Sequence, residues 1–161
     1  MNPTRLLFLL AFLTFACGSL HAADDDAEIR RAVNAMMDDY TNFFMTGRAD
    51  LIADRIYFAP FVTIPGEGPS AWMTKEQIRE NLAKTFEALA ADGYARSQWD
   101  KLTITVLSPA AVIVSGTYSR YRKDGSKIGT LAATYTVAKT KDGWRIVTLS
   151  RHAPAKTLDG N

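Results

Sequence analysis

The sequence predicts an α+β fold in which a curved antiparallel sheet wraps over three N-terminal helices and leaves a central pocket. Two observations lead to this prediction. Apolar residues recur at helical spacing before Gly93, whereas four long runs rich in Val, Ile, Thr and Tyr follow one another after it. Helices gathered on one face of an antiparallel sheet make an α+β domain, and a twisted sheet over helices tends to leave a mouth where ligands bind.

The first 22 residues have the pattern of a secretory signal peptide. Arg5 supplies the positive region, the apolar run 6–15 follows, and Ala22 is the small residue before the expected cleavage point. The sequence therefore predicts export to the periplasm or the outside of the cell. Residues 23–153 are expected to form one domain, and residues 154–161 a flexible tail.

Cys17 leaves a second interpretation of the N-terminus open. It precedes Gly18 and Ser19, as the lipid-carrying cysteine of a bacterial lipoprotein would, but Thr14 and Phe15 fit such a processing site poorly. Cys17 is also the only cysteine of the chain. Cleavage after residue 22 would remove it, so we expect no disulfide in the mature protein.

Composition argues against several classes of partner. The chain has 19 Lys and Arg against 17 Asp and Glu. A balance this even creates no large field of one sign, so we expect neither nucleic-acid binding nor membrane association after signal removal. One mature histidine, His152, and no cysteine leave no set of side chains with metal-ligand spacing. We therefore expect no metal and no cofactor.

The helices are predicted in chain order. Residues 27–45 carry apolar side chains at helical spacing from Ile29 to Phe44, and Gly47 is the expected C-terminal stop. A short second helix is expected over residues 50–58, followed by a short strand over residues 61–64. This strand is expected to end at Pro65, which cannot donate a hydrogen bond to a neighbouring strand.

The third helix has a well-defined start. Thr74 and Gln77 form a capping box, with Met73 and Ile78 at the positions of a hydrophobic staple. Gly93 is expected to end the helix. We expect a buried stripe at helical spacing, with Phe86 fully buried; its members are Ile78, Leu82, Phe86 and Leu89.

Four strands are expected over residues 99–107, 112–122, 129–139 and 144–151. Asp-Gly pairs in the last two turns are strong hairpin signals, because glycine tolerates the backbone conformation that such turns need. Residues 130–137 carry apolar or Thr side chains on both faces. A face left to water would normally alternate to charged residues, so we expect a homodimer through the outer sheet face.

Three local features follow one another along the chain. They are Gly47 followed by Ala49-Asp50-Leu51-Ile52, then Ala59-Pro60-Phe61-Val62-Thr63-Ile64-Pro65, then Asp142-Gly143-Trp144-Arg145-Ile146. With the order of elements, they make residues 27–152 resemble the nuclear transport factor 2-like superfamily, which includes SnoaL-like cyclases and ketosteroid isomerases. The resemblance implies a cystatin-like cone with a central pocket and frequent dimerisation. It does not imply one activity.

Of the catalytic residues that a resemblance to ketosteroid isomerases would imply, one has a counterpart in this sequence. Tyr40 stands where those enzymes carry a tyrosine that stabilises an oxyanion, but Ile64 occupies the position of their carboxylate base. Residues 129–138, which match the strand of the second carboxylate, contain no Asp or Glu. Proton abstraction needs a positioned base. We therefore expect no isomerase activity, and Tyr40 and His152 are the weak catalytic candidates that remain.

Tyr118 and Tyr121 are separated by an odd spacing, so regular pleating puts them on opposite faces of the sheet. Alignment to the isomerase sheet favours Tyr121 as the inward one, and a bulge near Gly116 or Gly129 would reverse this choice. The expected ligand-binding residues are Tyr40, Phe44, Trp72, Phe86, Tyr121, Tyr135 and His152.

The function that the sequence favours is an exported domain that binds a small hydrophobic or weakly polar molecule in an aromatic-lined pocket. One alternative is a SnoaL-like lyase, isomerase or cyclase that uses Tyr40 and His152. Another is a non-catalytic accessory or dimerisation module. A cavity with His152 outside it favours the first function. Convergence of Tyr40 and His152 on one cavity favours the second, and a filled interior with an apolar outer face favours the third.

Overall fold

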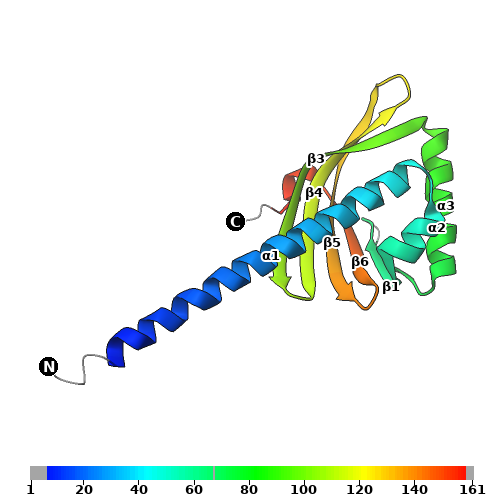
Figure 1. The fold of residues 1–161 in the computed structure, drawn as a ribbon. Coiled ribbons are helices and arrows are strands. Elements are labelled where there is room, and N and C mark those ends of the chain that lie inside the picture. Colours follow the sequence, from blue (N-terminus) through cyan, green and yellow to red (C-terminus); the bar gives the residue numbers. More distant parts are fainter. Residues whose placement is uncertain (1–6, 67, 159–161) are drawn as a thin grey trace.

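A computed structural model describes residues 7–66 and 68–158, with side chains from residue 24 onward. The first helix lies across a curved six-stranded sheet, and a second long helix stands at one end of it (Figure 1). The predicted α+β class is confirmed. The helices are α1 (Leu7–Met45), α2 (Ala49–Leu51), a π-helical turn (Ile52–Ile56), α3 (Lys75–Ala91) and a 3₁₀ turn (Pro154–Lys156), and the strands are β1 (Tyr57–Ile64), β2 (Ser70–Trp72), β3 (Tyr94–Ser108), β4 (Ala111–Arg122), β5 (Lys127–Thr140) and β6 (Gly143–His152).

The sheet is mixed rather than wholly antiparallel. Its strand order is β2-β1-β6-β5-β4-β3, and β1 runs parallel to β6 while every other neighbouring pair is antiparallel. The last four strands form the predicted meander. The chain passes through α3 between β1 and the meander, which allows β1 to join the far edge in the parallel direction. The sheet is not closed into a barrel.

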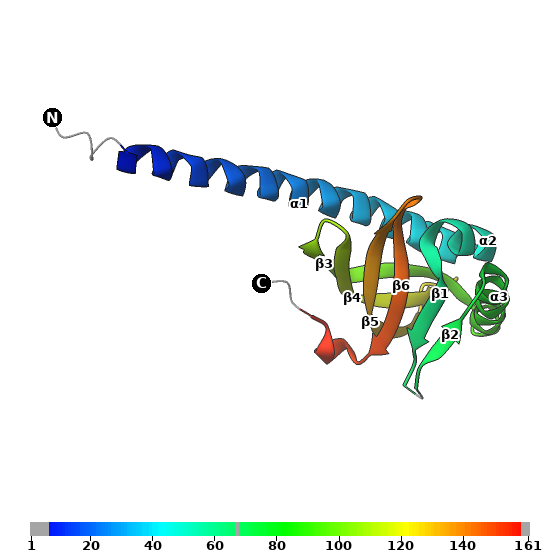
Figure 2. The same cartoon turned by 90° about the horizontal axis from the view of Figure 1, so that it is seen from below.

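Helix α1 is longer than predicted at its N-terminal end. It begins at Leu7 rather than near residue 27, and its first part projects away from the sheet (Figure 2). Residues 6–15 are mostly Leu, Phe and Ala, and Leu and Ala in particular have high helix propensity, which accounts for the extension. Gly47 ends the helix with a positive φ of 66°, as predicted. Within the described ranges, no helix combines the length and the apolarity that crossing a membrane requires.

The second helix ends earlier than predicted. Its π-helical turn stops at Ile56, and Tyr57 and Phe58 are the first residues of β1. Pro60 contributes to this, because the residue before a proline disfavours helical backbone and Ala59 must be extended. Tyr57 is consequently buried, with 3% of its surface exposed, at the start of an interior strand.

Helix α3 begins as predicted. The Gln77 main-chain N–H donates to Thr74 Oγ1 over 3.3 Å, and Gln77 Oε1 accepts from the Met73 N–H over 2.6 Å. The return bond of the capping box therefore reaches one residue further back than Thr74. Met73 is 58% exposed and buries little against Ile78, so the hydrophobic staple contributes little.

The core lies between α1, α3 and the inner face of the sheet. The prediction that Phe86 is fully buried is wrong. It lies partly exposed at the edge of the core, with its ring centroid 5.0 Å from that of Phe44. The other members of the predicted stripe on α3 are buried. The largest fully buried apolar side chains are Val33, Met37, Ile52, Ile56, Phe61, Ile78, Val112, Val114, Val137 and Ile146.

Strands β3 and β4 approach each other closely at Gly116. A Cβ at this position would lie 2.4 Å from the Lys101 carbonyl oxygen, a distance that no side chain tolerates. The pairing of the two strands shifts nearby, between Trp99 and Lys101. Such a shift bends the strand and re-aims side chains, and it brings Trp99 opposite Tyr118 on the inner face.

The outer face of the sheet is rich in paired hydroxyl groups. Ser115 and Thr134 are 2.8 Å apart at their hydroxyl oxygens, and Thr148 donates to Thr136 over 2.9 Å. The described part of the predicted loose tail packs on this face instead, because the Leu158 N–H donates to Ser115 Oγ over 3.1 Å. Pro154 starts the intervening 3₁₀ turn.

Candidate ligand-binding cavity

A cavity of about 50 Å³ lies between α1, α3 and the inner face of the sheet. It opens toward a wider groove of about 530 Å³ beside β1, β2 and α3. Trp72, Thr85, Arg120 and Arg151 line both spaces, and we refer to these four residues as the neck. The inner cavity is lined by Tyr40, Thr41, Phe44, Tyr57, Trp72, Leu82, Thr85, Ser97, Trp99, Tyr118, Arg120, Tyr135, Leu149 and Arg151.

Three buried tyrosines meet on one wall of the inner cavity. Tyr40 comes from α1, Tyr57 from β1 and Tyr135 from β5, and each has 7% or less of its surface exposed. The hydroxyl oxygens of Tyr40 and Tyr57 are 2.8 Å apart. The ring of Tyr40 meets that of Tyr135 edge-on at a centroid distance of 6.0 Å. The wall therefore combines aromatic surface with hydroxyl groups.

Burial keeps these three hydroxyl groups neutral. It raises the pKa of Tyr40 to about 12, although the hydrogen bond from Tyr57 partly opposes the shift. Burial also raises the pKa of Tyr57 and of Tyr135 well above the ordinary value. Desolvation disfavours the charged phenolate. At neutral pH the tyrosines can therefore donate and accept hydrogen bonds, but they supply no anionic base.

A second wall is aromatic and fixed in orientation. Trp99 Nε1 donates to Thr41 Oγ1 over 3.0 Å, and Thr41 Oγ1 in turn donates to the Met37 carbonyl over 2.8 Å. The ring of Trp99 meets that of Tyr118 edge-on at 5.3 Å. Edge-to-face rings and a bonded indole hold the indole plane in place. This wall of the cavity therefore has a fixed shape.

Arg120 provides one of the two positive charges at the neck; Arg151 provides the other. The guanidinium carbon of Arg120 lies 5.5 Å from the ring centroids of Phe44 and Tyr118 and 5.8 Å from that of Tyr94. Its Nε is buried and has no hydrogen-bond partner among the described residues. Cation–π attraction compensates in part for desolvation of the charge. Among the described residues that line the inner cavity, none is Asp or Glu.

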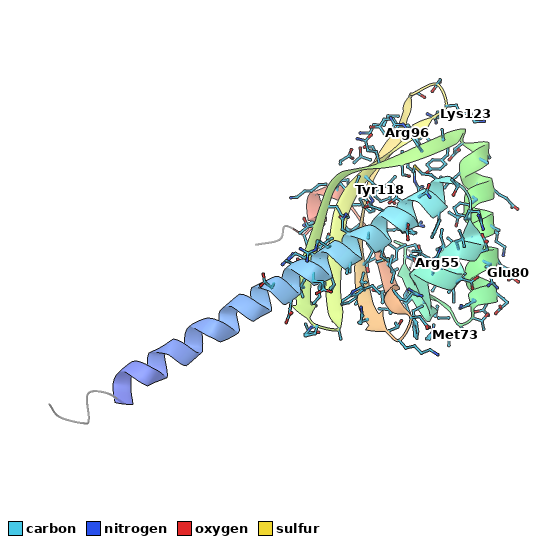
Figure 3. The ribbon with its side chains drawn as sticks, viewed as in Figure 1. Arg55, Met73, Glu80, Arg96, Tyr118 and Lys123 are labelled. Carbon is cyan, nitrogen blue, oxygen red and sulfur yellow. The ribbon has the colours of Figure 1, made fainter. Side chains whose placement is uncertain are left out.

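Four of the seven ligand-binding residues expected from the sequence line the inner cavity, namely Tyr40, Phe44, Trp72 and Tyr135. Phe86 does not; it lies behind Phe44. The expectation that Tyr121 points inward is wrong, because Tyr118 lines the cavity and Tyr121 lies under the Arg96 guanidinium at 4.0 Å. Figure 3 shows Tyr118 near α1, whereas Arg96 and Lys123 lie toward the tip of the β4–β5 hairpin.

Regular alternation along β4 explains which tyrosine points inward. Val112 and Val114 belong to the core, so the residues at even positions face inward as far as Arg120. The pairing with β5 does shift, but only between Arg120 and Tyr121. This is too late in the strand to turn Tyr118 outward.

His152 lies away from the cavity, on the outer face of the sheet. It stands opposite Ala132, and its Nε2 is 2.9 Å from Thr134 Oγ1. Its Nδ1 is 3.0 Å from the Ala153 carbonyl. A carbonyl can only accept, so Nδ1 carries the proton, and in the neutral ring Nε2 accepts from the Thr134 hydroxyl. Tyr40 and His152 therefore do not converge on one site.

Sequence reasoning missed several cavity residues. The sequence predicts Tyr57 within the second helix and Trp99 as the first residue of a strand, so neither is expected in a cavity. Arg120 follows Tyr118 by two residues and Arg151 follows Leu149 by two, so each shares a face with a cavity residue. The alternation of side chains along a strand was therefore the sequence signal that could have placed both arginines at the cavity. In the part of the chain that the structure describes, no three His, Cys, Asp or Glu side chains are grouped closely enough to hold a metal ion.

A curved sheet that wraps over a long helix and encloses a small cavity defines the cystatin-like, nuclear transport factor 2-like class of domain. The chain belongs to the family described as NTF2-like protein (DUF6841), which matches residues 26–154. This confirms the resemblance seen in the sequence. No protein with a curated description matches the chain.

Several solved structures share the fold at low sequence identity. An NTF2-like protein with a cystatin-like fold from Novosphingobium aromaticivorans is 21% identical, with a TM-score of 0.65 and 92% of each chain covered. An NTF2-like superfamily protein from Salmonella enterica is 20% identical, with a TM-score of 0.62, covering 84% of this chain and 98% of that one. A putative calcium/calmodulin-dependent protein kinase II association domain from Xanthomonas campestris is 20% identical, with a TM-score of 0.60. The match covers 78% of this chain and 88% of that one.

Proposed function

We propose that this protein is an exported small-molecule-binding domain that takes a small, largely apolar ligand into the inner cavity without dedicated catalysis. The observation that carries the proposal is the lining of the cavity. Neutral tyrosine hydroxyls and aromatic rings surround it, and the described lining contains no carboxylate and no histidine. A mostly apolar pocket with a few polar groups that fix orientation is the usual form of a ligand site.

The same lining argues against the isomerase-like alternative. Proton abstraction requires a base with a pKa near the working pH. The position of the isomerase base is held by Ile64, which is 42% exposed and does not line the cavity. Tyr40 has a pKa of about 12 and hydrogen-bonds to another tyrosine, so it can stabilise a polar ligand group but cannot start such a reaction.

The size of the inner cavity limits what it holds. Its volume of about 50 Å³ is smaller than the roughly 150 Å³ of an engineered cavity that binds benzene. A short apolar body fits this volume, and a longer ligand would extend through the neck into the outer groove.

Ligand-observed NMR with a library of small fragments tests the proposal on the purified protein. We expect binders that are lost in Leu149→Phe, because Leu149 lines the cavity and the larger ring fills it. Leu107→Phe is the matched control, since Leu107 is 60% exposed and does not line the cavity. A library without binders, or binders that survive Leu149→Phe, would contradict the proposal.

Export is part of the same proposal and rests on the N-terminal sequence pattern. N-terminal sequencing of protein secreted by an expressing bacterium measures it directly. We expect the mature chain to start at Ala23. A lipid-modified N-terminus at Cys17 would replace this proposal with a membrane-tethered lipoprotein.

A homodimer through the outer sheet face is also proposed, and paired hydroxyl groups support it. Ser115 with Thr134, and Thr136 with Thr148, satisfy one another within the sheet. Hydroxyl groups that already have partners lose less on leaving water than unpaired ones. The outer face can therefore be covered by a second copy at a low desolvation cost. The described tail covers part of this face, where the 3₁₀ turn lies against β5 and the Leu158 N–H donates to Ser115 Oγ.

A further inference from the structure

The neck of the cavity contains two arginines without an acidic partner in the described parts of the chain. Arg120 on β4 and Arg151 on β6 line both the inner cavity and the outer groove. The ion pairs found among the described residues involve Asp50, Asp54 and Glu76, and neither neck arginine takes part in one. Two guanidinium groups thus face the ligand space with their charges uncompensated by a carboxylate.

Arg120 is the more constrained of the two. Three aromatic rings surround its guanidinium, and its Nε–H is buried without an acceptor in the described residues. A buried polar group without a partner is rare, because it has lost its water and gained nothing in exchange. The rings attract the cation from their faces, but they do not replace an in-plane acceptor. An acceptor supplied by a ligand would complete this site.

The outer groove, into which the neck opens, has a further basic residue in its lining. Lys84 on α3 lines it together with the two arginines, and Asp92 is the acidic residue of the described lining. The main-chain carbonyl of Asp92 accepts from Arg122 Nε over 2.9 Å, at the end of the groove where α3 stops. Basic residues that line a cleft raise the local concentration of anions.

We propose that the ligand is a small organic acid, whose carboxylate binds Arg120 and Arg151 at the neck while a short apolar body lies against Tyr118, Trp99 and Tyr40. This inference rests on the proposed ligand-binding function and refines it. It departs from the hydrophobic or weakly polar ligand that the sequence favours. A planar guanidinium matches a carboxylate through two parallel hydrogen bonds, which makes the pair stronger than a neutral hydrogen bond.

The neutral tyrosine hydroxyls of the inner cavity determine which polar groups the rest of the ligand can carry. Tyr40, Tyr57 and Tyr135 are buried in the lining of the same cavity and can bond one hydroxyl or carbonyl oxygen of the ligand. The inner volume of about 50 Å³ limits the body to a few carbon atoms. A straight-chain acid of about four carbons is therefore a suitable probe.

Isothermal titration calorimetry with butyrate and butyramide tests the inference on the purified protein. The two probes have nearly the same shape and differ in charge. We expect butyrate to bind at least about tenfold more tightly than butyramide. Arg151→Gln should lower the affinity for butyrate at least about tenfold and change that for butyramide by less than about twofold. Arg151 is exposed, so this variant should fold.

Two further variants separate the roles of charge and geometry. Arg120→Lys keeps the charge but loses the planar fork, so we expect weaker butyrate binding. Arg145→Gln removes the same charge from β6. Arg145 is adjacent to the buried Trp144 and does not line the cavity. This control should bind butyrate as the wild type does.

The outcomes also separate the inference from the proposed function. Equal affinity for butyrate and butyramide would overturn the inference and leave a neutral-ligand cavity in place. Inorganic phosphate that binds as tightly as butyrate, and still binds to Leu149→Phe, would show a simple anion site and also overturn it. Failure of both probes while other fragments bind would overturn the inference alone. Failure of the whole fragment library would overturn the proposed function as well.

Discussion

At the scale of single residues, the cavity depends on a few side chains whose positions are tightly fixed. Tyr40 hydrogen-bonds to Tyr57, and its ring contacts Phe44 and Tyr135. Gly116 allows β3 and β4 to approach where the sheet bends toward Trp99. Each of these residues contributes both to the packing of the core and to the shape of the cavity. A substitution at each position should therefore change the stability of the protein measurably.

Tyr40→Phe should destabilise the protein by about 1 to 3 kcal/mol, because it leaves the buried Tyr57 hydroxyl without its partner. Binding of a cavity ligand should weaken by about 0.5 to 1.5 kcal/mol through the lost hydroxyl. Urea unfolding and calorimetry measure the two effects. Tyr121→Phe is the matched control, since Tyr121 lies outside the cavity, and it should change stability by less than about 0.5 kcal/mol.

Gly116→Ala should destabilise the protein by about 1 to 3 kcal/mol, because the added Cβ would lie 2.4 Å from the Lys101 carbonyl oxygen and the strands must move apart. Gly129→Ala provides the control. Gly129 lies in β5, and a Cβ there would meet no atom within 4 Å. Urea unfolding of both variants checks the prediction, and equal stabilities would show that β3 and β4 do not require the close approach.

Alkaline pH should unfold the protein through its buried tyrosines. The pKa of Tyr40 is about 12 in the folded state, against about 10 in an unfolded chain. The raised pKa means that its contribution to stability is fully present below about pH 10 and is lost as the pH rises toward 12. Tyrosinate absorbance followed with far-UV circular dichroism should show cooperative ionisation together with unfolding. Ionisation of all tyrosines near pH 10 without unfolding would contradict the burial.

At the scale of elements, local chemistry determines where most helices and strands begin and end. Gly47 and Gly93 follow α1 and α3 with positive φ values, and Thr74 caps α3. The exceptions lie where two tendencies compete. Helix α1 continues into the apolar N-terminal segment, and Tyr57 joins β1 because it packs against Phe61 at a ring distance of 4.0 Å.

Thr74→Ala should destabilise the protein by about 1 kcal/mol, because the Gln77 N–H loses its acceptor at the start of α3. Thr46→Ala is the matched control. Thr46 lies just after the C-terminal end of α1, where its hydroxyl bonds back to the Asn42 carbonyl, and such bonds contribute little to stability. Thermal unfolding of both variants measures the difference, and equal losses would contradict the role of the cap.

At the scale of the whole molecule, the sheet separates two environments. Its inner face carries the core and the cavity, and its outer face carries paired hydroxyl groups and His152. The cavity opens at the end where β1, β2 and α3 meet, so a second copy on the outer face would leave the neck open. Ligand binding and dimer formation are therefore compatible in this architecture.

Sedimentation equilibrium at micromolar concentration should give the mass of a homodimer. Ile113→Lys should shift the protein to the monomer. Ile113 lies on β4 between the buried, inward-facing Val112 and Val114, so its side chain points outward from this interior strand. Met73→Lys adds the same charge at an exposed residue just before α3, outside the strands of the sheet, and should leave the mass unchanged. A wild-type protein with the mass of a monomer would contradict the dimer.

The sequence by itself determined the fold class, the ends of α1 and α3 near Gly47 and Gly93, and the hairpin turns that contain Gly125 and Gly143, because these depend on local propensity and turn chemistry. It also determined that Tyr40 lies on the buried face of α1. Only the tertiary structure decided that β1 pairs in parallel with β6, that Tyr118 rather than Tyr121 lines the cavity, and that His152 lies outside it. It also brought Arg120 and Arg151 to one neck from strands that do not adjoin. These outcomes depend on strand order and on where a bulge falls, and both are set by contacts between residues distant in sequence.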